Sequence, residues 1–271
     1  MIWCLLDLAD RARRILQVQR DTLDSLAAKS SWVPAIAMML VSTLSYIDRN
    51  ALAVLIPSIQ KDTGLSAQEY GWIVAAFSYA YMLGNPLWGM FLDRIGVRRG
   101  MLLAVGGWTV ASAAHAFAGS LGAFAILRTL LGFFEGATFP GSLRTVVQSL
   151  APLEGSRGIA LSFTGGSLGA IVTPFLVTPI AVAFGWQAAF WATGVAGVVW
   201  LLWWVRVSER PTLRQATAME SGPVAFRWRH PRVWAFVFIY SLGAMPLGFI
   251  LYMSGIYLTK VFHTTQADLG R

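Results

Sequence analysis

Seven stretches of the chain are long and apolar enough to cross a lipid bilayer, and this feature constrains the fold more than any other. A helix needs about 20 mainly apolar residues to span the hydrocarbon core. The stretches are 32–57, 70–92, 100–119, 121–148, 158–183, 187–206 and 232–259. Apolar residues make up 56% of the chain and charged residues only 13%, which exceeds the roughly one-half apolar share of a soluble domain. We expect an all-α integral membrane protein.

The basic residues lie in short bursts between these stretches, which indicates orientation rather than nucleic-acid binding. The net charge is +8, but a nucleic-acid interface needs its basic residues together on a solvated face. The bursts comprise Arg11, Arg13, Arg14, Arg20 and Lys29, then Arg94, Arg98 and Arg99, then Arg206, Arg210, Arg214, Arg227, Arg229 and Arg232. Because Lys and Arg concentrate on cytoplasmic loops, we expect a multi-pass protein of the cell (inner) membrane with a cytoplasmic N-terminus.

The spacing of the spans divides the chain into four segments. Residues 1–31 predict a short amphipathic helix on the inner surface, although an upstream start-site artefact would explain them equally well. Residues 32–206 hold six spans, and the polar, arginine-rich residues 207–231 form a cytoplasmic linker. Residues 232–271 contain a seventh helix that begins a second domain. Six spans followed by a basic linker favour a repeat architecture of inverted three-helix units.

Glycines four positions apart predict close contacts between helices. Gly132 and Gly136 form one such pair, and Gly165 and Gly169 form another. Small residues at this spacing let helix backbones approach one another in lipid, where the hydrophobic effect does not drive helices together. We therefore expect a closely packed bundle.

Four ionisable side chains lie well inside the apolar spans: Asp48 and Arg49 in the first, and Arg128 and Glu135 in the fourth. Each costs about 2.5 to 3.5 kcal/mol at a helix centre on insertion scales, so each needs a partner or a watery cavity. They indicate a transport pathway. The alternative is two internal salt bridges that only tie helices together.

Helix geometry separates the directions of these four residues. Arg128 and Glu135 are seven positions apart, so they share one helix face about 10 Å from each other. Asp48 and Arg49 are adjacent and project about 100° apart. One of the adjacent pair therefore faces the cavity while the other faces a neighbouring helix.

The charges of these four residues sum to zero, which couples anion entry to proton uptake. A carboxylate substrate would leave excess negative charge in a low-dielectric site, and protonation of Asp48 or Glu135 would remove it. Arg49 suits the carboxylate because its planar guanidinium forms two parallel charge-assisted hydrogen bonds. The hydroxyls of Tyr46, Tyr79 and Tyr81 are candidates for holding substrate hydroxyls, with helix packing or interface anchoring as the alternative.

The loop after the second span reads GMFLDRIGVRRG, from Gly89 to Gly100. We expect Gly89 to permit close helix approach and Gly96 to form a tight turn. Asp93 and Arg94 are predicted to cap a helix end at the cytoplasmic face. The basic pair Arg98 and Arg99 follows.

This loop resembles the signature G-x-x-x-D-R-x-G-x-R-R of the major facilitator superfamily, and RTLLGFFEG in the fourth span resembles that superfamily's R-x-x-x-G signature. The runs SYIDRNALAVLIP, AFSYAYMLGNPLWG and FFEGATFPG are similar to its anion:cation symporter branch, which includes hexuronate, galactonate and glucarate transporters. The resemblance implies a major facilitator fold, here a six-helix N-terminal bundle plus a seventh helix. The likeness begins at about residue 32.

The resemblance also implies roles for individual residues. Arg49, Tyr46 and Tyr81 match substrate contacts, and Asp48 and Glu135 match proton-coupling acids. Arg128 matches the arginine that pairs with and tunes those acids. The loop residues Gly89, Asp93, Arg94, Gly96, Arg98 and Arg99 match the conformational gate. In the superfamily the loop aspartate engages a helix of the second half. The family often has a glutamine before the second-span proline, whereas this chain has Asn85. This difference concerns the fine specificity for substrate.

Enzymatic chemistry is not supported by the sequence. Gly165, Ser167 and Gly169 formally match the hydrolase pattern G-x-S-x-G, but that motif needs a strand-to-helix turn and a histidine partner. His115 is better explained as a packed neutral imidazole. We expect no metal, because the single cysteine, Cys4, has no ligand partner nearby. The chain contains no G-x-x-x-x-G-K loop, so ATP-driven transport is not supported. We also expect no cofactor.

The sequence thus predicts the first half of a secondary transporter that moves sugar acids with protons. We expect its partners to be a small organic anion, protons, the lipid bilayer and a missing C-terminal half or its split-gene product. A truncated or split gene and a fragmentary record are favoured over a half-transporter that dimerises. The alternatives are a non-transporting membrane fragment and a major facilitator transporter of another substrate class.

Overall fold

The computed structural model describes residues 31–210, 213, 231–263 and 265. The predicted amphipathic segment, except for its last residue, and most of the predicted linker lie outside these residues. The described residues form eight helical elements and no strand. These are α2 (Val33–Thr63), α3 (Ala67–Ala114), the short 3-10 helix η1 (His115–Phe117), α4 (Leu121–Glu135), α5 (Thr138–Ser149), α6 (Gly155–Phe184), α7 (Trp186–Val207) and α9 (Pro231–Phe262). The all-α membrane fold is confirmed.

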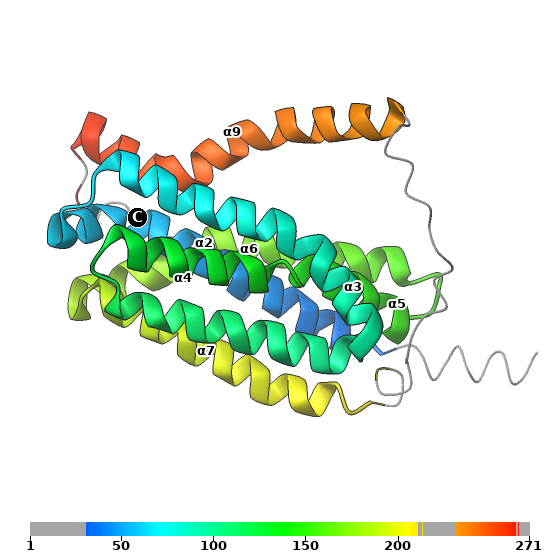
Figure 1. The fold of residues 1–271 in the computed structure, drawn as a ribbon. Coiled ribbons are helices and arrows are strands. Elements are labelled where there is room, and N and C mark those ends of the chain that lie inside the picture. Colours follow the sequence, from blue (N-terminus) through cyan, green and yellow to red (C-terminus); the bar gives the residue numbers. More distant parts are fainter. Residues whose placement is uncertain (1–30, 211–212, 214–230, 264, 266–271) are drawn as a thin grey trace, which may run out of the picture.

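The helix α3 contains two of the predicted spans, joined by a reversal at Gly96. Gly96 has φ 80° and ψ 160°, a backbone conformation that glycine adopts without steric cost. In Figure 1 the ribbon of α3 runs along the bundle and then turns back beside itself. We call residues 67–95 the first arm and residues 97–114 the second arm. With these arms counted separately, the six membrane-length helices of the described chain account for all seven predicted spans.

The helices α4 and α5 form one membrane span, interrupted only at Gly136 and Ala137. The interruption lies where α4 meets the first arm of α3. A methyl group on Gly136 would lie 2.7 Å from the carbonyl carbon of Gly84 and 2.8 Å from the amide nitrogen of Asn85. The two backbones can approach this closely only because Gly136 has no side chain, as its spacing from Gly132 predicted.

The helix α6 packs against α2 through the other predicted glycines. A methyl group on Gly169 would lie 2.7 Å from Cβ of Tyr46, and one on Gly165 would lie 2.9 Å from Cβ of Ser42. The neighbouring Gly166 leaves room for the Tyr46 ring, which a methyl group there would meet at 2.8 Å. The glycine face of α6 therefore fixes the position of Tyr46 in α2.

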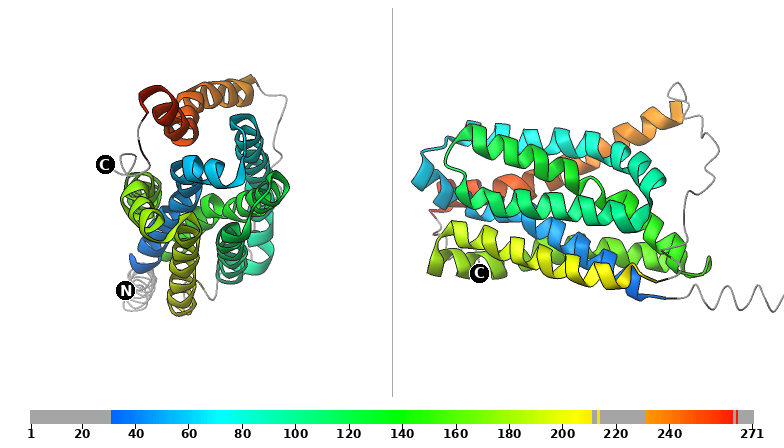
Figure 2. Two further views of the ribbon diagram at one scale, coloured as in Figure 1. Left: turned by 90° about the vertical axis from the view of Figure 1, so that its left-hand side faces the viewer. Right: turned by 60° about the horizontal axis from the view of Figure 1, so that its bottom comes forward.

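The helix α9 lies along one side of the bundle, with its first turns apart from the other helices and its later turns against them (Figures 1 and 2). A methyl group on Gly255 would lie 2.7 Å from the carbonyl oxygen of Ala53 in α2. The Tyr70 hydroxyl, at the start of α3, donates a hydrogen bond of 2.7 Å to the carbonyl oxygen of Tyr252. These contacts bring the second half of α9 over the middle of α2.

Two apolar clusters occupy the two ends of the bundle and leave the charged residues between them. One cluster includes Met38, Val41, Trp108, Trp200 and Trp204. The other includes Leu55, Ile59, Tyr70, Phe124 and Phe190. Asp48 is the middle residue of the 31-residue helix α2, so about 23 Å of helix lies on each side of it. The charges therefore lie near the centre of the span.

Candidate functional site

The centre of the site is an ion pair between Arg49 of α2 and Glu135, the last residue of α4. Arg49 Nε donates to Glu135 Oε2 at 2.6 Å, and the side chains are 11% and 0% exposed. The Ser45 hydroxyl donates to the same carboxylate oxygen at 2.8 Å. The other oxygen, Oε1, is buried and has no hydrogen-bond partner among the described residues. The glutamate is therefore held on one oxygen only.

Aromatic rings surround the Arg49 guanidinium. Its Cζ lies 4.3 Å from the ring centroid of Tyr81, 4.9 Å from that of Tyr46 and 5.3 Å from that of Phe77. Tyr46 comes from α2, one turn before Arg49, whereas Phe77 and Tyr81 lie one turn apart on the first arm of α3. Ring faces attract a cation and strengthen that attraction when water is excluded. The rings hold the cation without neutralising its charge.

Asp48 points away from this ion pair, towards the outer helices. Its Oδ1 accepts a hydrogen bond of 2.6 Å from the Ser112 hydroxyl in the second arm of α3. Ser112 Oγ lies 3.0 Å from Thr193 Oγ1 of α7. Within the described chain, no cationic side chain lies within ion-pair distance of the Asp48 carboxylate. Asp48 is thus a second, separate buried carboxyl group, and the predicted divergence from Arg49 is confirmed.

Arg128 of α4 is the least satisfied of the four charged residues. Its side chain is buried, and its Nη2 donates a long hydrogen bond of 3.4 Å to the backbone carbonyl of Asp48. Its Nε has no partner among the described residues. A void too small for a water molecule separates it from Arg49, Tyr70 and Tyr252. Arg128 therefore retains unused hydrogen-bond donors beside the central ion pair.

The four charges do not form two salt bridges. The structure shows one ion pair, a carboxyl group held by hydroxyls, and an arginine bonded to a backbone carbonyl. Arg128 shares a buried face with Glu135, as the seven-residue spacing predicted. A purely structural role would favour pairing both arginines with both acids, because an unpaired buried charge is costly.

Several residues of the site gave no distinctive signal in the sequence. They are Ser45, Phe77, Ser112, Thr193, Tyr70 and Tyr252. Hydroxyl and aromatic residues are common in membrane helices, so their positions relative to Asp48 and Arg49 depend on packing between helices. Tyr252 lies on the seventh predicted span, and no pattern in the sequence connects that span to the site.

Two further candidates have different surroundings. Tyr79 is 66% exposed, so its predicted substrate role does not fit its position outside the site. His115 is fully buried, and its Nδ1 lies 2.7 Å from the carbonyl oxygen of Ala111. It stacks on Phe190 at a centroid distance of 5.2 Å. The pattern Gly165, Ser167 and Gly169 lies inside the helix α6 and not at a strand-to-helix turn.

The signature loop lies at the end of the bundle where the arms of α3 meet. Asp93 forms an ion pair with Arg144 of α5, whose Nη1 also donates to the carbonyl oxygen of Leu92 at 3.1 Å. Arg98 lies 3.4 Å from the carboxylate of Glu209, after the end of α7. Asp93 thus binds a residue of the same half, whereas the resemblance implied a helix of the second half.

The other residues of the signature loop have different surroundings in the structure. Gly96 makes the predicted turn. A methyl group on Gly89 would meet only Pro140, at an ordinary contact distance of 3.9 Å, so the predicted close approach at Gly89 is wrong. Gly84 and Gly136 provide that close approach instead. Arg94 and Arg99 are exposed, and no hydrogen bond or ion pair joins either to another described residue.

Across the described residues, no three His, Cys, Asp or Glu side chains are grouped to hold a metal ion.

Comparisons with known proteins agree with this architecture. The Major Facilitator Superfamily profile matches residues 38–270. The chain is 32% identical over 179 residues to the galacturonate transporter of Dickeya chrysanthemi, covering 66% of this chain and 52% of that protein. It is 31% identical to the hexuronate transporter of Escherichia coli K12, covering 66% and 42% of the two proteins. The D-galactonate transporter of E. coli O6:H1 is 32% identical, with 67% and 42% covered. The chain spans about half the length of these relatives.

A solved structure shows the same fold. The bacterial homologue of the human lysosomal transporter Spinster, in an inward-facing and unoccupied conformation, superposes with a TM-score of 0.72 at 17% identity. The superposition covers 88% of this chain and 57% of that protein. The relatives and the fold are those of transporters and not of enzymes. This chain, with its helical bundle and buried central charges, belongs to the Major Facilitator Superfamily of membrane transporters.

Proposed function

We propose that the chain forms the N-terminal half of a proton-coupled symporter for organic anions of the sugar-acid class. One observation carries the proposal: the Arg49–Glu135 ion pair, enclosed by aromatic rings, uses only one oxygen of the glutamate. Relatives at 31 to 32% identity are transporters of galacturonate, hexuronate and D-galactonate. Each of these substrates carries one carboxylate and several hydroxyls.

The exchange of carboxylates at Arg49 would couple the two fluxes. A substrate carboxylate that binds the Arg49 guanidinium displaces the Glu135 carboxylate from it. The displaced Glu135 carboxylate is then left in buried surroundings that disfavour its negative charge. Protonation of Glu135 removes that charge, and the Ser45 hydroxyl remains as a hydrogen-bond partner. Anion binding thereby drives proton uptake. Arg128 retains unused donors for a second polar group of the substrate, and the hydroxyls of Tyr46 and Tyr81 complete this side of the site.

Asp48 would supply a second protonation site. Its carboxyl group is buried beside hydroxyls and lacks a cationic partner among the described residues. The backbone of the same residue accepts the hydrogen bond from Arg128. A change in the charge of the Asp48 carboxyl group would therefore affect Arg128 through the backbone of Asp48 itself. The loop of Asp93, Arg94, Gly96, Arg98 and Arg99, with the neighbouring Gly89, would form the conformational gate.

We propose that the protein lies in the inner membrane with its N-terminus in the cytoplasm. The arginines of the signature loop lie at the same end of the bundle as Arg206 and Arg210, where Trp204 donates to the carbonyl oxygen of Arg98 and Glu209 meets the Arg98 side chain. Concentration of arginine at one end supports a cytoplasmic location. A second half of the transporter would close the other side of the site.

Uptake of labelled galacturonate tests the function. The chain would be produced with the C-terminal half of the E. coli hexuronate transporter in cells lacking their own hexuronate transporter. We expect proton-driven uptake that requires both halves and is abolished by Arg49→Ala. If both halves insert and purify together but no organic acid accumulates, the proposal is wrong and the chain is a non-transporting fragment. Uptake that Arg49→Ala leaves unchanged contradicts the site.

A further inference from the structure

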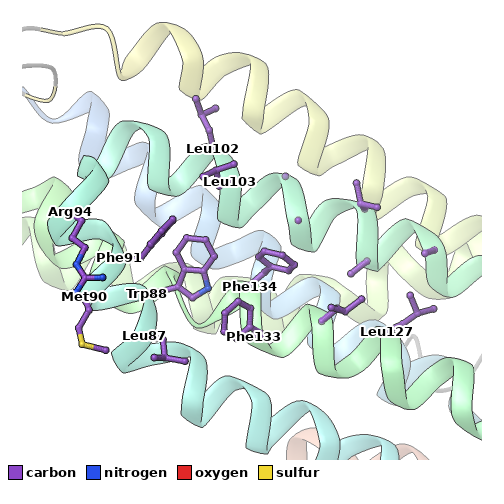
Figure 3. Close-up of a pocket in the computed structure, with 16 residues that line it drawn as sticks. Leu87, Trp88, Met90, Phe91, Arg94, Leu102, Leu103, Leu127, Phe133 and Phe134 are labelled. Atoms are coloured by element: carbon purple, nitrogen blue, oxygen red, sulfur yellow. The ribbon is translucent and has the colours of Figure 1, made fainter.

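A second cavity lies between the two arms of α3 and α4, on the side of the first arm away from α9. Its volume is about 970 Å³, and it is lined almost entirely by apolar side chains. Figure 3 shows Trp88 and Phe134 in its middle, with Arg94 at one end and Leu127 at the other. None of its lining residues belongs to the charged site. We call it the α3–α4 groove.

The groove opens to the exterior of the bundle. Its rim residues Leu103, Val110 and Met90 are 55%, 71% and 52% exposed. Gly106 lies on the same face of the second arm as Leu103 and Val110, and an added methyl group there would meet no atom within 4 Å. In a membrane protein, an apolar side chain on this outer face meets lipid and not water. Hydrocarbon chains are therefore the medium that fills the groove.

The groove is slightly longer than one leaflet of a bilayer is thick. Leu102 and Ala114 line the groove and are twelve positions apart on the second arm, which corresponds to about 18 Å of helix. One leaflet contributes about 15 Å of the hydrocarbon core. Within the predicted span 100–119, an acyl chain that enters beside Leu102 would thus pass the middle of the bilayer near Thr109 and end close to Ala114.

Arg94 provides a positive charge at the interfacial end of the groove. Its neighbours Asp93 and Arg98 are paired with Arg144 and Glu209, whereas no hydrogen bond or ion pair joins Arg94 to another described residue. In Figure 3 its guanidinium lies beside Met90, at the end of the groove opposite Leu127. A phosphate fits this end, and a cationic head group does not.

We propose that the α3–α4 groove binds an acyl chain of an anionic phospholipid, with its phosphate on Arg94. Basic residues between membrane helices at the interface recognise anionic head groups, and the groove supplies the apolar half of the site. The bound lipid contacts both arms of α3 and α4, so it joins the helix that carries Glu135 to the helix that carries Tyr81. The proposal does not rest on the proposed transport function, although it uses Arg94 of the signature loop.

Photolabelling of the purified 271-residue chain tests the proposal. The probe is phosphatidylglycerol with a diazirine in one acyl chain, and phosphatidylcholine with the same acyl chain is the comparison. We expect the phosphatidylglycerol probe to label peptides 87–94, 102–114 and 127–134. Arg94→Gln should reduce this labelling about fivefold, because an arginine near an anionic surface contributes about 1 kcal/mol. Arg157→Gln, on the exposed start of α6, is the matched control and should not change it.

Two variants test whether the acyl chain lies in the groove. Gly106→Leu should fill part of the groove and reduce labelling severalfold, whereas Gly122→Leu, at another open position, should not. Val110→Trp narrows the rim and serves as a second blocking variant if Gly106→Leu does not elute as a folded protein. Equal labelling by both probes, or labelling that survives both blocking variants, would overturn the proposal.

Discussion

Arg49 and Glu135 are 86 positions apart in the sequence, yet their side chains meet at 2.6 Å in the middle of the bundle. The pair connects α2 to the end of α4, and Ser45 holds the glutamate from one helical turn before Arg49. A charged side chain alone in an apolar span is costly. The ion pair offsets this cost for both Arg49 and Glu135. The pair is also the point at which a substrate carboxylate can compete.

Replacement of Arg49 by lysine should weaken substrate binding strongly although the charge is kept. The ammonium group cannot form two parallel hydrogen bonds to a carboxylate, so we expect a loss of about tenfold or more, equivalent to about 1.4 kcal/mol. Galacturonate binding to the purified chain, alone and with the second half, measures this. Arg157→Lys is the control, and equal losses in the two variants would contradict a specific role for Arg49.

Glu135→Gln should separate binding from proton coupling. Glutamine keeps the shape and the Ser45 hydrogen bond but cannot gain or lose a proton in this range of pH. We expect exchange of labelled for unlabelled substrate to persist while accumulation driven by a proton gradient is lost. Accumulation at the wild-type level in this variant would show that the coupling proton binds elsewhere.

Gly166→Ala should disturb the site from outside it. The added methyl group would meet the Tyr46 ring at 2.8 Å, so the ring or α6 must move, at a cost of about 1 to 3 kcal/mol. Thermal unfolding in detergent measures the loss. Gly122→Ala, where no atom lies within 4 Å, is the matched control, and equal unfolding temperatures for the two variants would refute the contact.

Tyr70→Phe should loosen α9 without changing the central ion pair. The substitution removes only the hydroxyl that donates to the Tyr252 carbonyl, which should cost about 1 kcal/mol. Amide hydrogen exchange should increase in the second half of α9 and remain unchanged in α4. Unchanged exchange in α9 would show that this hydrogen bond does not hold the helix.

The sequence predicted the membrane spans because their composition alone sets where they lie. It also separated Asp48 from Arg49, since adjacent residues on a helix point in different directions. It did not predict which arginine meets which acid, because that depends on how α2 and α4 are rotated against each other. The partner of Asp93 was missed for a similar reason: Arg144 lies 51 positions away on α5, and no local pattern connects the two residues.

The pattern of glycines was informative in one place and misleading in another. Gly132, Gly136, Gly165 and Gly169 recur at the spacing of a helix face, and each lies at a close contact. Gly89 belongs to a loop signature and not to such a face, and the space around it is ordinary. In this chain the four-residue spacing of glycines predicted close contacts between helices, whereas membership of the loop signature did not.

Proton uptake on substrate binding tests the central claim, the exchange of carboxylates at Arg49, most directly. Galacturonate would be added to the purified transporter in a weakly buffered solution that contains a pH-sensitive dye, with mannitol as the uncharged comparison. We predict alkalinisation on addition of galacturonate in the wild type and in Arg157→Gln, and none in Glu135→Gln, although that variant still binds the anion. Equal alkalinisation in Glu135→Gln and the wild type would contradict the account.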